Sequence, residues 1–178
     1  MENLKYKLTE NKKVINGITL YQIQALKSFN NVKINDLGGW VEKEENLSFY
    51  GDAWIYGDAR VSGNAWIYGD ACIYGDARVS GNACVYGNAL VYGNALVYGN
   101  ARVSGNAICE KNNIININTI YNITITQNHI QIGCKQKTIQ EWKDWLKSDD
   151  IIETHRDTDK FKKIKKALKA CFLLIKAR

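Results

Sequence analysis

A strict six-residue pattern of small, polar and apolar positions runs through the centre of the chain. From Gly51 to Glu110 the sequence forms ten consecutive hexads without insertion: GDAWIY GDARVS GNAWIY GDACIY GDARVS GNACVY GNALVY GNALVY GNARVS GNAICE. Each hexad begins with Gly, then Asp or Asn, then Ala, and its fifth residue is Ile or Val except at Cys109. A period of six fits neither an α-helix nor a meander of ordinary hairpins.

Each hexad is predicted to form one short strand and one corner. The fourth to sixth residues form the strand, in which alternation directs the fifth side chain inward and its neighbours outward. The Gly-Asp or Gly-Asn pair tolerates the backbone conformation of a sharp bend. The Ala side chain fits just inside that corner, where a larger one would collide. The inward Ile and Val column is therefore the expected core.

An aliphatic residue followed four positions later by a small one, as in Ile55 and Ala59, recurs along the repeat. In this feature the chain resembles the hexapeptide-repeat proteins, whose left-handed parallel β-helix uses three hexads for one triangular coil. The resemblance implies an 18-residue coil and left-handed winding. The left-handed sense comes from the resemblance alone, because the general crossover rule favours right-handed winding. Weaker hexads extend the register at Gly39–Val41, Glu45–Leu47 and Lys111–Asn113.

Winding the chain into such coils converts spacing in the sequence into columns on three outer faces. The first face is expected to stack two columns: Trp54, Cys72, Leu90, Ile108 and Tyr56, Tyr74, Tyr92. The second is expected to stack Trp66, Cys84, Arg102 beside Tyr50, Tyr68, Tyr86. The third begins with Arg60, Ser62, Arg78, Ser80 and becomes apolar at Leu96 and Tyr98. Along the corners, asparagine side chains are expected to form amide ladders.

The first face is apolar and aromatic on its outside, which is unusual for a surface in contact with water. We expect it to be covered by another subunit or by the terminal segments of the same chain. The expected oligomer or partner interface comprises ten residues of the first two faces: Trp54, Tyr56, Cys72, Tyr74, Leu90, Tyr92, Ile108, Trp66, Tyr68 and Tyr86. A homo-oligomer, dimer or trimer, is expected.

The segments on either side of the repeat are predicted to close its two ends. Residues 13–23 predict a β-hairpin with a tight primed turn at Asn16-Gly17. Beyond the repeat we expect strands at Asn113–Ile117, Tyr121–Thr126 and His129–Ile132, then helices at 138–147 and 157–175. The first helix opens with a capping box, Thr138 to Glu141. The predicted divisions are 1–38 (N-terminal β cap), 39–116 (β-helix) and 117–178 (C-terminal β cap and two helices).

The basic excess lies in the last quarter of the chain. The net charge is +6, and residues 135–178 hold 13 basic and 7 acidic residues. Outside its apolar stripe the second predicted helix carries six lysines, which together we call the lysine face: Lys160, Lys162, Lys163, Lys165, Lys166 and Lys169. Such a face is either a solvated helix surface or a contact for nucleic acid or an acidic partner. An anionic membrane is a weaker alternative.

The flanking segments carry a second resemblance. The leader YKLT…INGITLYQIQALKSF…VKINDLGGWVEKEENLS and the tail IGCKQKTIQEW…THRDTDKFKK look like hexapeptide-repeat proteins common in phage and prophage genomes. This resemblance implies a phage or prophage source more firmly than it implies an activity.

The residue inventory argues against an enzyme. Acyltransferases with this type of helix generally use a histidine base between subunits, whereas the two histidines here, His129 and His155, lie outside the hexads. The sequence contains no phosphate loop, GxSxG, HExxH or zinc-ligand spacing. We therefore expect no catalytic, cofactor or metal site.

The remaining sequence features indicate the cellular compartment of the protein. Its five cysteines include no CxxC pair, which favours free thiols in a reducing compartment. The first residues are polar and the longest apolar run is Ala170–Ile175, so neither a secretory signal nor a membrane span is expected. A cytoplasmic protein is expected.

Elimination leaves a non-catalytic, oligomeric binding protein as the leading hypothesis. Its candidate partners are a host protein, a nucleic-acid-containing complex and a nucleotide. The resemblance to phage proteins implies that this binding protein acts against host defence. It would inhibit or sequester a host component, for example a CRISPR-type nuclease complex or a nucleotide signal. A hexapeptide-repeat acyltransferase and a polymer-forming structural protein remain alternatives.

Overall fold

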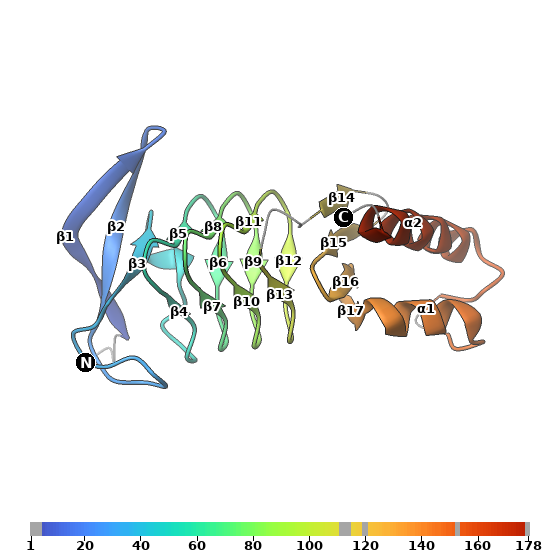
Figure 1. Ribbon diagram of the computed structural model, residues 1–178, viewed down its shortest axis with the longest axis horizontal. Coiled ribbons are helices and arrows are strands. Elements are labelled where there is room, and N and C mark those ends of the chain that lie inside the picture. Colours follow the sequence, from blue (N-terminus) through green and yellow to red (C-terminus); the bar gives the residue numbers. More distant parts are fainter. Residues whose placement is uncertain (1–4, 111–114, 119–120, 152–153, 177–178) are drawn as a thin grey trace.

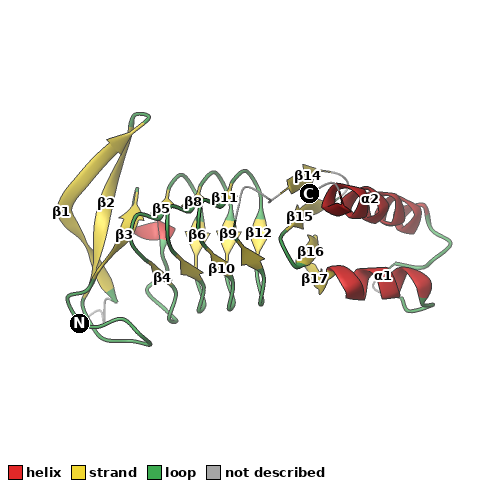
Figure 2. Ribbon diagram, in the orientation of Figure 1, coloured by secondary structure: helices red, strands yellow, loops and turns green. Residues whose placement is uncertain are grey.

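The computed structural model describes residues 5–110, 115–118, 121–151 and 154–176. The molecule is elongated (Figure 1). A β-hairpin lies at one end, a stack of short parallel strands forms the middle, and a small sheet with two helices lies at the other end (Figure 2). Two separate hydrophobic cores correspond to this arrangement, one running through the stack and one between the C-terminal sheet and helices.

The stack is built from two-residue strands, each contributed by one hexad. They are β4 (Trp54–Ile55), β5 (Arg60–Val61), β6 (Trp66–Ile67), β7 (Cys72–Ile73), β8 (Arg78–Val79), β9 (Cys84–Val85), β10 (Leu90–Val91), β11 (Leu96–Val97), β12 (Arg102–Val103) and β13 (Ile108–Cys109). Each strand pairs in parallel with the strand three hexads later, as Trp54 does with Cys72. The strands therefore form three sheets, and the predicted β-solenoid of 18-residue coils is confirmed. The left-handed sense of winding stays a prediction.

The segments of the weaker hexads before Gly51 also belong to the solenoid, but the predicted 18-residue register does not extend to them, because Val41 pairs with Val61 and Leu47 with Ile67, each 20 residues later. Strand β3 (Leu37–Val41) pairs in parallel with β5, and Leu47 forms a single parallel bridge to Ile67. A short 3-10 turn, η1 (Glu44–Asn46), lies between them. The weak hexad expected at 111–113 lies outside the described residues.

The hexad positions behave as the repeat predicts. The Ala at position three and the apolar residue at position five are buried in every hexad, from Ala53 and Ile55 to Ala107 and Cys109. The predicted amide ladder forms along one corner, where Asn64 Nδ2 donates to Asn82 Oδ1 at 3.3 Å and Asn82 Nδ2 donates to Asn100 Oδ1 at 3.2 Å. Burial of a regular apolar column therefore stabilises each coil against the next.

The corner glycines are required for two reasons. At Gly81 the φ angle is +71°, in the region that side chains disfavour. A Cβ atom there would also lie 2.9 Å from the backbone nitrogen of Gly99 in the next coil. Glycine thus supplies both the bend and the close approach between coils.

The predicted N-terminal hairpin is confirmed and is longer than expected. Strands β1 (Tyr6–Ile15) and β2 (Ile18–Ala25) pair antiparallel. Positive φ values at Asn16 and Gly17 form the primed turn. Strand β2 pairs in turn with β3, so the hairpin extends one sheet of the solenoid in the order β1-β2-β3-β5-β8-β11. The open strand edge at that end is thereby paired.

A four-stranded antiparallel sheet follows the last coil. It consists of β14 (Ile115–Asn118), β15 (Asn122–Ile125), β16 (His129–Ile132) and β17 (Lys135–Thr138). The loop between β15 and β16 contacts the last coil, where Gln127 N donates to Ile108 O at 3.2 Å. In addition, Ser104 Oγ donates to Gln136 Oε1 at 2.9 Å. The sequence did not predict β17, because KQKT lacks apolar alternation.

Two helices complete the C-terminal region. Helix α1 (Ile139–Lys147) has the predicted capping box, with Thr138 Oγ1 accepting from Glu141 N at 3.1 Å. Helix α2 (Asp159–Lys176) begins two residues later than expected, because Thr158 Oγ1 accepts from Phe161 N at 3.2 Å and starts the helix there. Among the helices that the structure describes, none is long and apolar enough to cross a membrane.

Candidate binding surfaces

The first face of the solenoid is closed at its N-terminal end by the chain itself. The register stacks Trp54, Cys72, Leu90 and Ile108 as predicted. However, the Trp54 side chain is only 1% exposed. Its indole contacts the Phe29 ring edge to face at 5.4 Å. Trp54 is therefore a core residue and not part of an exposed interface.

The rest of the first face is half-buried. Cys72, Leu90 and Ile108 keep part of their surface in contact with water. The outward rings of Tyr74 and Tyr92 stack with centroids 5.1 Å apart and planes inclined by 5°. Burial raises the pKa of the Cys72 thiol, and the nearby Asp70 carboxylate acts in the same direction. Cys72 is therefore a weak nucleophile that serves as a small apolar side chain.

The second face carries a continuous stack of three rings, which we call the aromatic stripe: Trp66, Tyr68 and Tyr86. The Trp66 and Tyr68 centroids lie 4.1 Å apart, and those of Tyr68 and Tyr86 lie 4.8 Å apart with planes only 3° from parallel. Burial and the neighbouring Tyr86 raise the pKa of Tyr68, so its phenol stays protonated. Trp66 is 46% exposed, which leaves the end of the stack accessible.

A groove of about 520 Å³ lies at the exposed end of the aromatic stripe. We call it the acidic groove. It is lined by the residues Glu44, Glu45, Leu47, Ser48, Phe49, Tyr50 and Trp66. The carboxylates of Glu44 and Glu45 are exposed, and the structure gives neither an ion pair among the described residues. Lys43, adjacent in sequence, donates instead to Asn64 Oδ1 at 3.2 Å.

Sequence reasoning stacked Tyr68 on Tyr86, but it placed Trp66 in the neighbouring column and missed the groove. In the structure Glu42 Oε2 accepts from Gly63 N at 2.6 Å, while Glu44 and Glu45, in η1, line the same groove as Trp66. The available signal was the spacing between the inward residues Leu47 and Ile55, which exceeds the six-residue period by two residues and so breaks the regular coil beside the groove.

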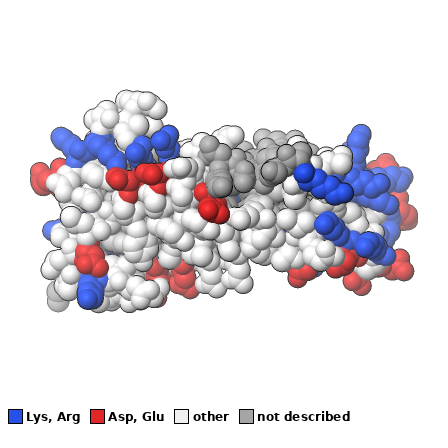
Figure 3. All heavy atoms as spheres, in the orientation of Figure 1, with Lys and Arg blue, Asp and Glu red and all other residues white. Residues whose placement is uncertain are grey.

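The predicted lysine face is exposed on α2. Each of its six lysines lies at the surface. Lys162 Nζ lies 3.1 Å from Asp159 Oδ1, and Lys160 Nζ lies 5.3 Å from the centroid of the Tyr121 ring. The hairpin and α2, at opposite ends of the molecule, carry most of the basic residues in Figure 3, and the visible coils between them carry few charges. The lysine face is thus separate from the aromatic stripe.

The two histidines lie in the C-terminal region, one in β16 and one just before α2. His129, in β16, is half-buried, and burial lowers its pKa while the Glu141 carboxylate opposes that shift. His155 lies in the exposed segment before α2. Within the described ranges, no three His, Cys, Asp or Glu side chains gather as metal ligands would.

The central coils match a known repeat family. Residues 53–69, 71–85, 83–99 and 95–109 match the family model described as YdcK Beta solenoid repeat. Together with the stacked parallel coils, this similarity shows that the chain is a β-solenoid repeat protein. No curated protein matches the chain.

Proposed function

We propose that this β-solenoid is a non-catalytic binding protein that holds a basic segment of a partner protein on the aromatic stripe and in the acidic groove. The observation that carries the proposal is the stack of Trp66, Tyr68 and Tyr86 beside a groove with two carboxylates that form no ion pair with any residue the structure describes.

The aromatic stripe is suited to binding because its rings are already ordered. Tyr68 is held between Trp66 and Tyr86, and Gln131 Nε2 lies 3.5 Å from the Tyr86 hydroxyl. Binding of a partner therefore costs little conformational entropy in the side chains of the aromatic stripe. Exposed, rigid Trp and Tyr side chains are also the residue types that dominate binding energy in protein interfaces.

The charge of the groove selects the partner. Glu44 and Glu45 place negative charge in the same groove as Trp66 and Tyr50. Lys and Arg side chains suit such a site, because the carboxylates attract them and the ring faces add a cation–π contact. The chain's own nearest basic side chain in sequence, Lys43, is engaged with Asn64. A basic loop or tail of another protein is thus the occupant that the chemistry favours.

The resemblance of the flanks to phage and prophage proteins supports a biological setting. We place the proposed binding in phage counter-defence in the host cytoplasm, with a host defence complex, such as a CRISPR-type nuclease complex, as the partner. Occlusion by a rigid solenoid requires no catalytic group, which agrees with the residue types found in the hexads.

The test compares Trp66→Ala with Tyr98→Ala, since Tyr98 is also an exposed outward aromatic residue, 59% exposed. Expression of the wild-type chain should restore phage plating on cells with active CRISPR defence, and Tyr98→Ala should retain that effect. Trp66→Ala and Glu44→Lys should lose it. Reconstitution of the purified nuclease complex with each variant should show an affinity loss of at least about tenfold for the latter two.

Two outcomes would contradict the proposal. One is equal protection and equal affinity for wild type and Trp66→Ala. The other is binding of acetyl-CoA in calorimetry that is lost on His129→Ala or His155→Ala, which would replace binding by acyl transfer.

A further inference from the structure

One short motif occurs three times in the solenoid, in two different settings. The tripeptide Arg-Val-Ser stands at 60–62, 78–80 and 102–104. The first two copies are 18 residues apart, so Arg60 and Arg78 are direct partners in neighbouring coils of the third face. The third copy is offset by 24 residues, and Arg102 therefore pairs with Cys84 on the second face.

The N-terminal hairpin turns the first two copies into the floor of a cavity. A space of about 210 Å³ lies between the hairpin and the coils. Its lining from the hairpin is Ile15, Asn16, Ile18 and Leu20, and its lining from the solenoid is Arg60, Ser62, Arg78, Val79 and Ser80. The cavity thus has an apolar wall on one side and two Arg-Ser pairs on the other.

The guanidinium groups in this cavity have no acceptor within the described part of the chain. Arg60 is half-buried, and its Nε atom is fully buried without a hydrogen-bond partner. Neither Arg60 nor Arg78 forms an ion pair there. Leaving a buried guanidinium donor without an acceptor costs free energy, so the arrangement favours an anion that supplies acceptor oxygens.

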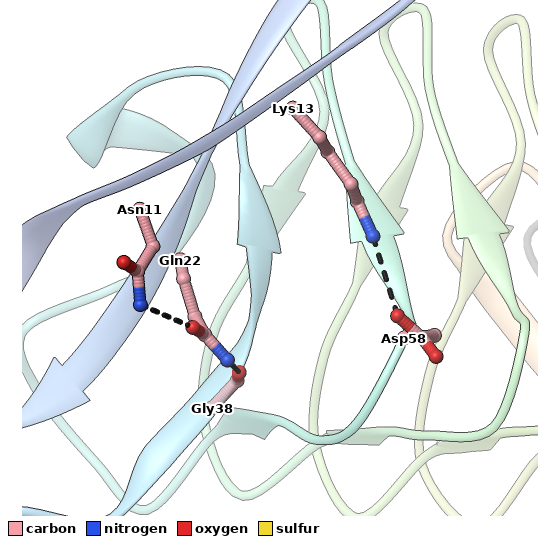
Figure 4. A network of polar contacts seen from close by, with 5 residues as sticks. All are labelled: Asn11, Lys13, Gln22, Gly38 and Asp58. Atoms are coloured by element: carbon pink, nitrogen blue, oxygen red, sulfur yellow. Dashed lines mark hydrogen bonds and ion pairs between the residues drawn. The ribbon is translucent and has the colours of Figure 1, made fainter.

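Other charged side chains lie near the solenoid wall of this cavity. Lys13 Nζ reaches from β1 to Asp58 Oδ1 at 3.3 Å, as Figure 4 shows, and lies 3.9 Å from the centroid of the Trp40 ring. Burial lowers the pKa of Lys13, and Arg60 adds to that shift while Asp58 and Asp76 oppose it. Asp58 is therefore engaged by Lys13, and Asp76 is a second carboxylate whose charge acts on Lys13.

We propose that this cavity binds a small phosphorylated ligand. The phosphate oxygens accept hydrogen bonds from the guanidinium groups of Arg60 and Arg78 and from the hydroxyls of Ser62 and Ser80. Planar guanidinium groups suit phosphate because they donate two parallel hydrogen bonds. The organic part of the ligand packs against Ile15 and Ile18. The site is separate from the aromatic stripe and does not depend on the partner proposed for it.

The experiment titrates the full chain with two probes, inorganic pyrophosphate and adenosine monophosphate. Binding is followed by calorimetry and by the Nε–Hε resonances of the arginines in nuclear magnetic resonance spectra. We expect the Arg60 and Arg78 resonances to shift and the Arg102 resonance to stay unchanged. Arg78→Ala should weaken binding at least about tenfold, whereas Arg102→Ala, which removes the same residue from the same motif on another face, should not.

A second variant weakens binding through a substitution in the hairpin and leaves the solenoid residues unchanged. Ile18→Asp places a carboxylate on the rim of the cavity at a side chain that is already 37% exposed, and it should weaken both probes. Tighter binding of the nucleotide supports the packing of an organic group against Ile15 and Ile18, whereas tighter binding of pyrophosphate assigns the site to inorganic phosphate and overturns that contact. Dissociation constants above about 10 mM for both probes, or an equal effect of Arg78→Ala and Arg102→Ala, would overturn the assignment.

Discussion

Tyr6 and Trp54 meet edge to face, with ring centroids 6.2 Å apart and an interplanar angle of 74°. The contact joins the first strand of the hairpin to the first regular hexad of the solenoid. Both side chains are only 1% exposed. The N-terminal segment is therefore an integral part of the solenoid core, and the chain covers the beginning of its own apolar face.

The hydroxyl of Tyr6 provides a first prediction. It lies 2.6 Å from Glu44 O and 2.8 Å from Leu47 O, and it shares its proton between these two carbonyl groups. Tyr6→Phe leaves both carbonyls without this donor and should lower the free energy of unfolding by about 1–3 kcal/mol. Urea denaturation measures the loss. Tyr98→Phe, which changes an exposed phenol, is the matched control and should be close to neutral; equal losses in the two variants would refute the role of Tyr6.

Lys5 provides a second prediction, based on pH. Its ammonium donates to Ala53 O at 2.8 Å, and burial lowers its pKa from 10.5 to about 8, although Asp52 opposes the shift. Between these two values the unfolded chain binds more protons than the folded chain, so Lys5 makes stability increase with pH. Below pH 8 both states are charged and the cost of burial is fully present.

The variant Lys5→Met removes this titration. The difference in unfolding free energy, wild type minus Lys5→Met, should therefore rise by about 2 kcal/mol from below pH 8 to pH 10.5, after allowance for solvent screening. Urea denaturation of both proteins across that range measures it. Taking the difference cancels the tyrosines and cysteines that titrate in the same window. A difference that stays constant with pH would show that Lys5 has an ordinary pKa.

The corner glycines provide a third prediction. Gly57 and Gly81 both have positive φ values, +58° and +71°, so an alanine at either position is strained by roughly 1–2 kcal/mol. Only Gly81 also faces the next coil, where a new Cβ atom would lie 2.9 Å from Gly99 N, whereas no atom lies within 4 Å at Gly57. Gly81→Ala should therefore cost at least about 1 kcal/mol more than Gly57→Ala in thermal or urea unfolding. Equal costs would mean that the coils can separate without penalty.

The proposed dimer or trimer provides a fourth prediction. Leu90 and Leu96 occupy the same position of two identical hexads, GNALVY, but they pair on different faces. If the uncovered part of the first face joins the subunits, Leu90→Lys should reduce the mass in light scattering to that of a monomer, because it places a charge in an apolar contact. Leu96→Lys should leave the mass unchanged. A wild-type mass for Leu90→Lys would show that this face is not the contact.

The pairing of residues between neighbouring coils could be predicted from the spacing of single residues. The 18-residue spacing of Trp54 and Cys72, or of Trp66 and Cys84, was enough to give the register that the structure shows. The hairpin turn at Asn16-Gly17 and the capping box at Thr138 were equally readable, because each depends on a few neighbouring residues. Strand β17 could not be predicted, because its polar sequence forms a strand by pairing with β16.

The candidate sites were predicted only in part. The stacking of Tyr68 on Tyr86 follows from the repeat, and the structure confirms it. The acidic groove beside Trp66 did not follow, because it depends on where η1 leaves the regular coil. The arginine cavity also depends on a distant segment, since the same Arg-Val-Ser motif is covered by the hairpin at Arg60 and stays open at Arg102.

The sequence by itself determined the solenoid, its coil length and its columns of outward residues, because a strict local period repeats the same backbone choice in every hexad. Only the tertiary structure decided which columns meet water. The segments that cover Trp54 and Arg60 belong to the N-terminal part of the chain and are distant from these residues in sequence. No local sequence pattern indicates those contacts. What this molecule presents for binding is therefore set by its non-repeating ends.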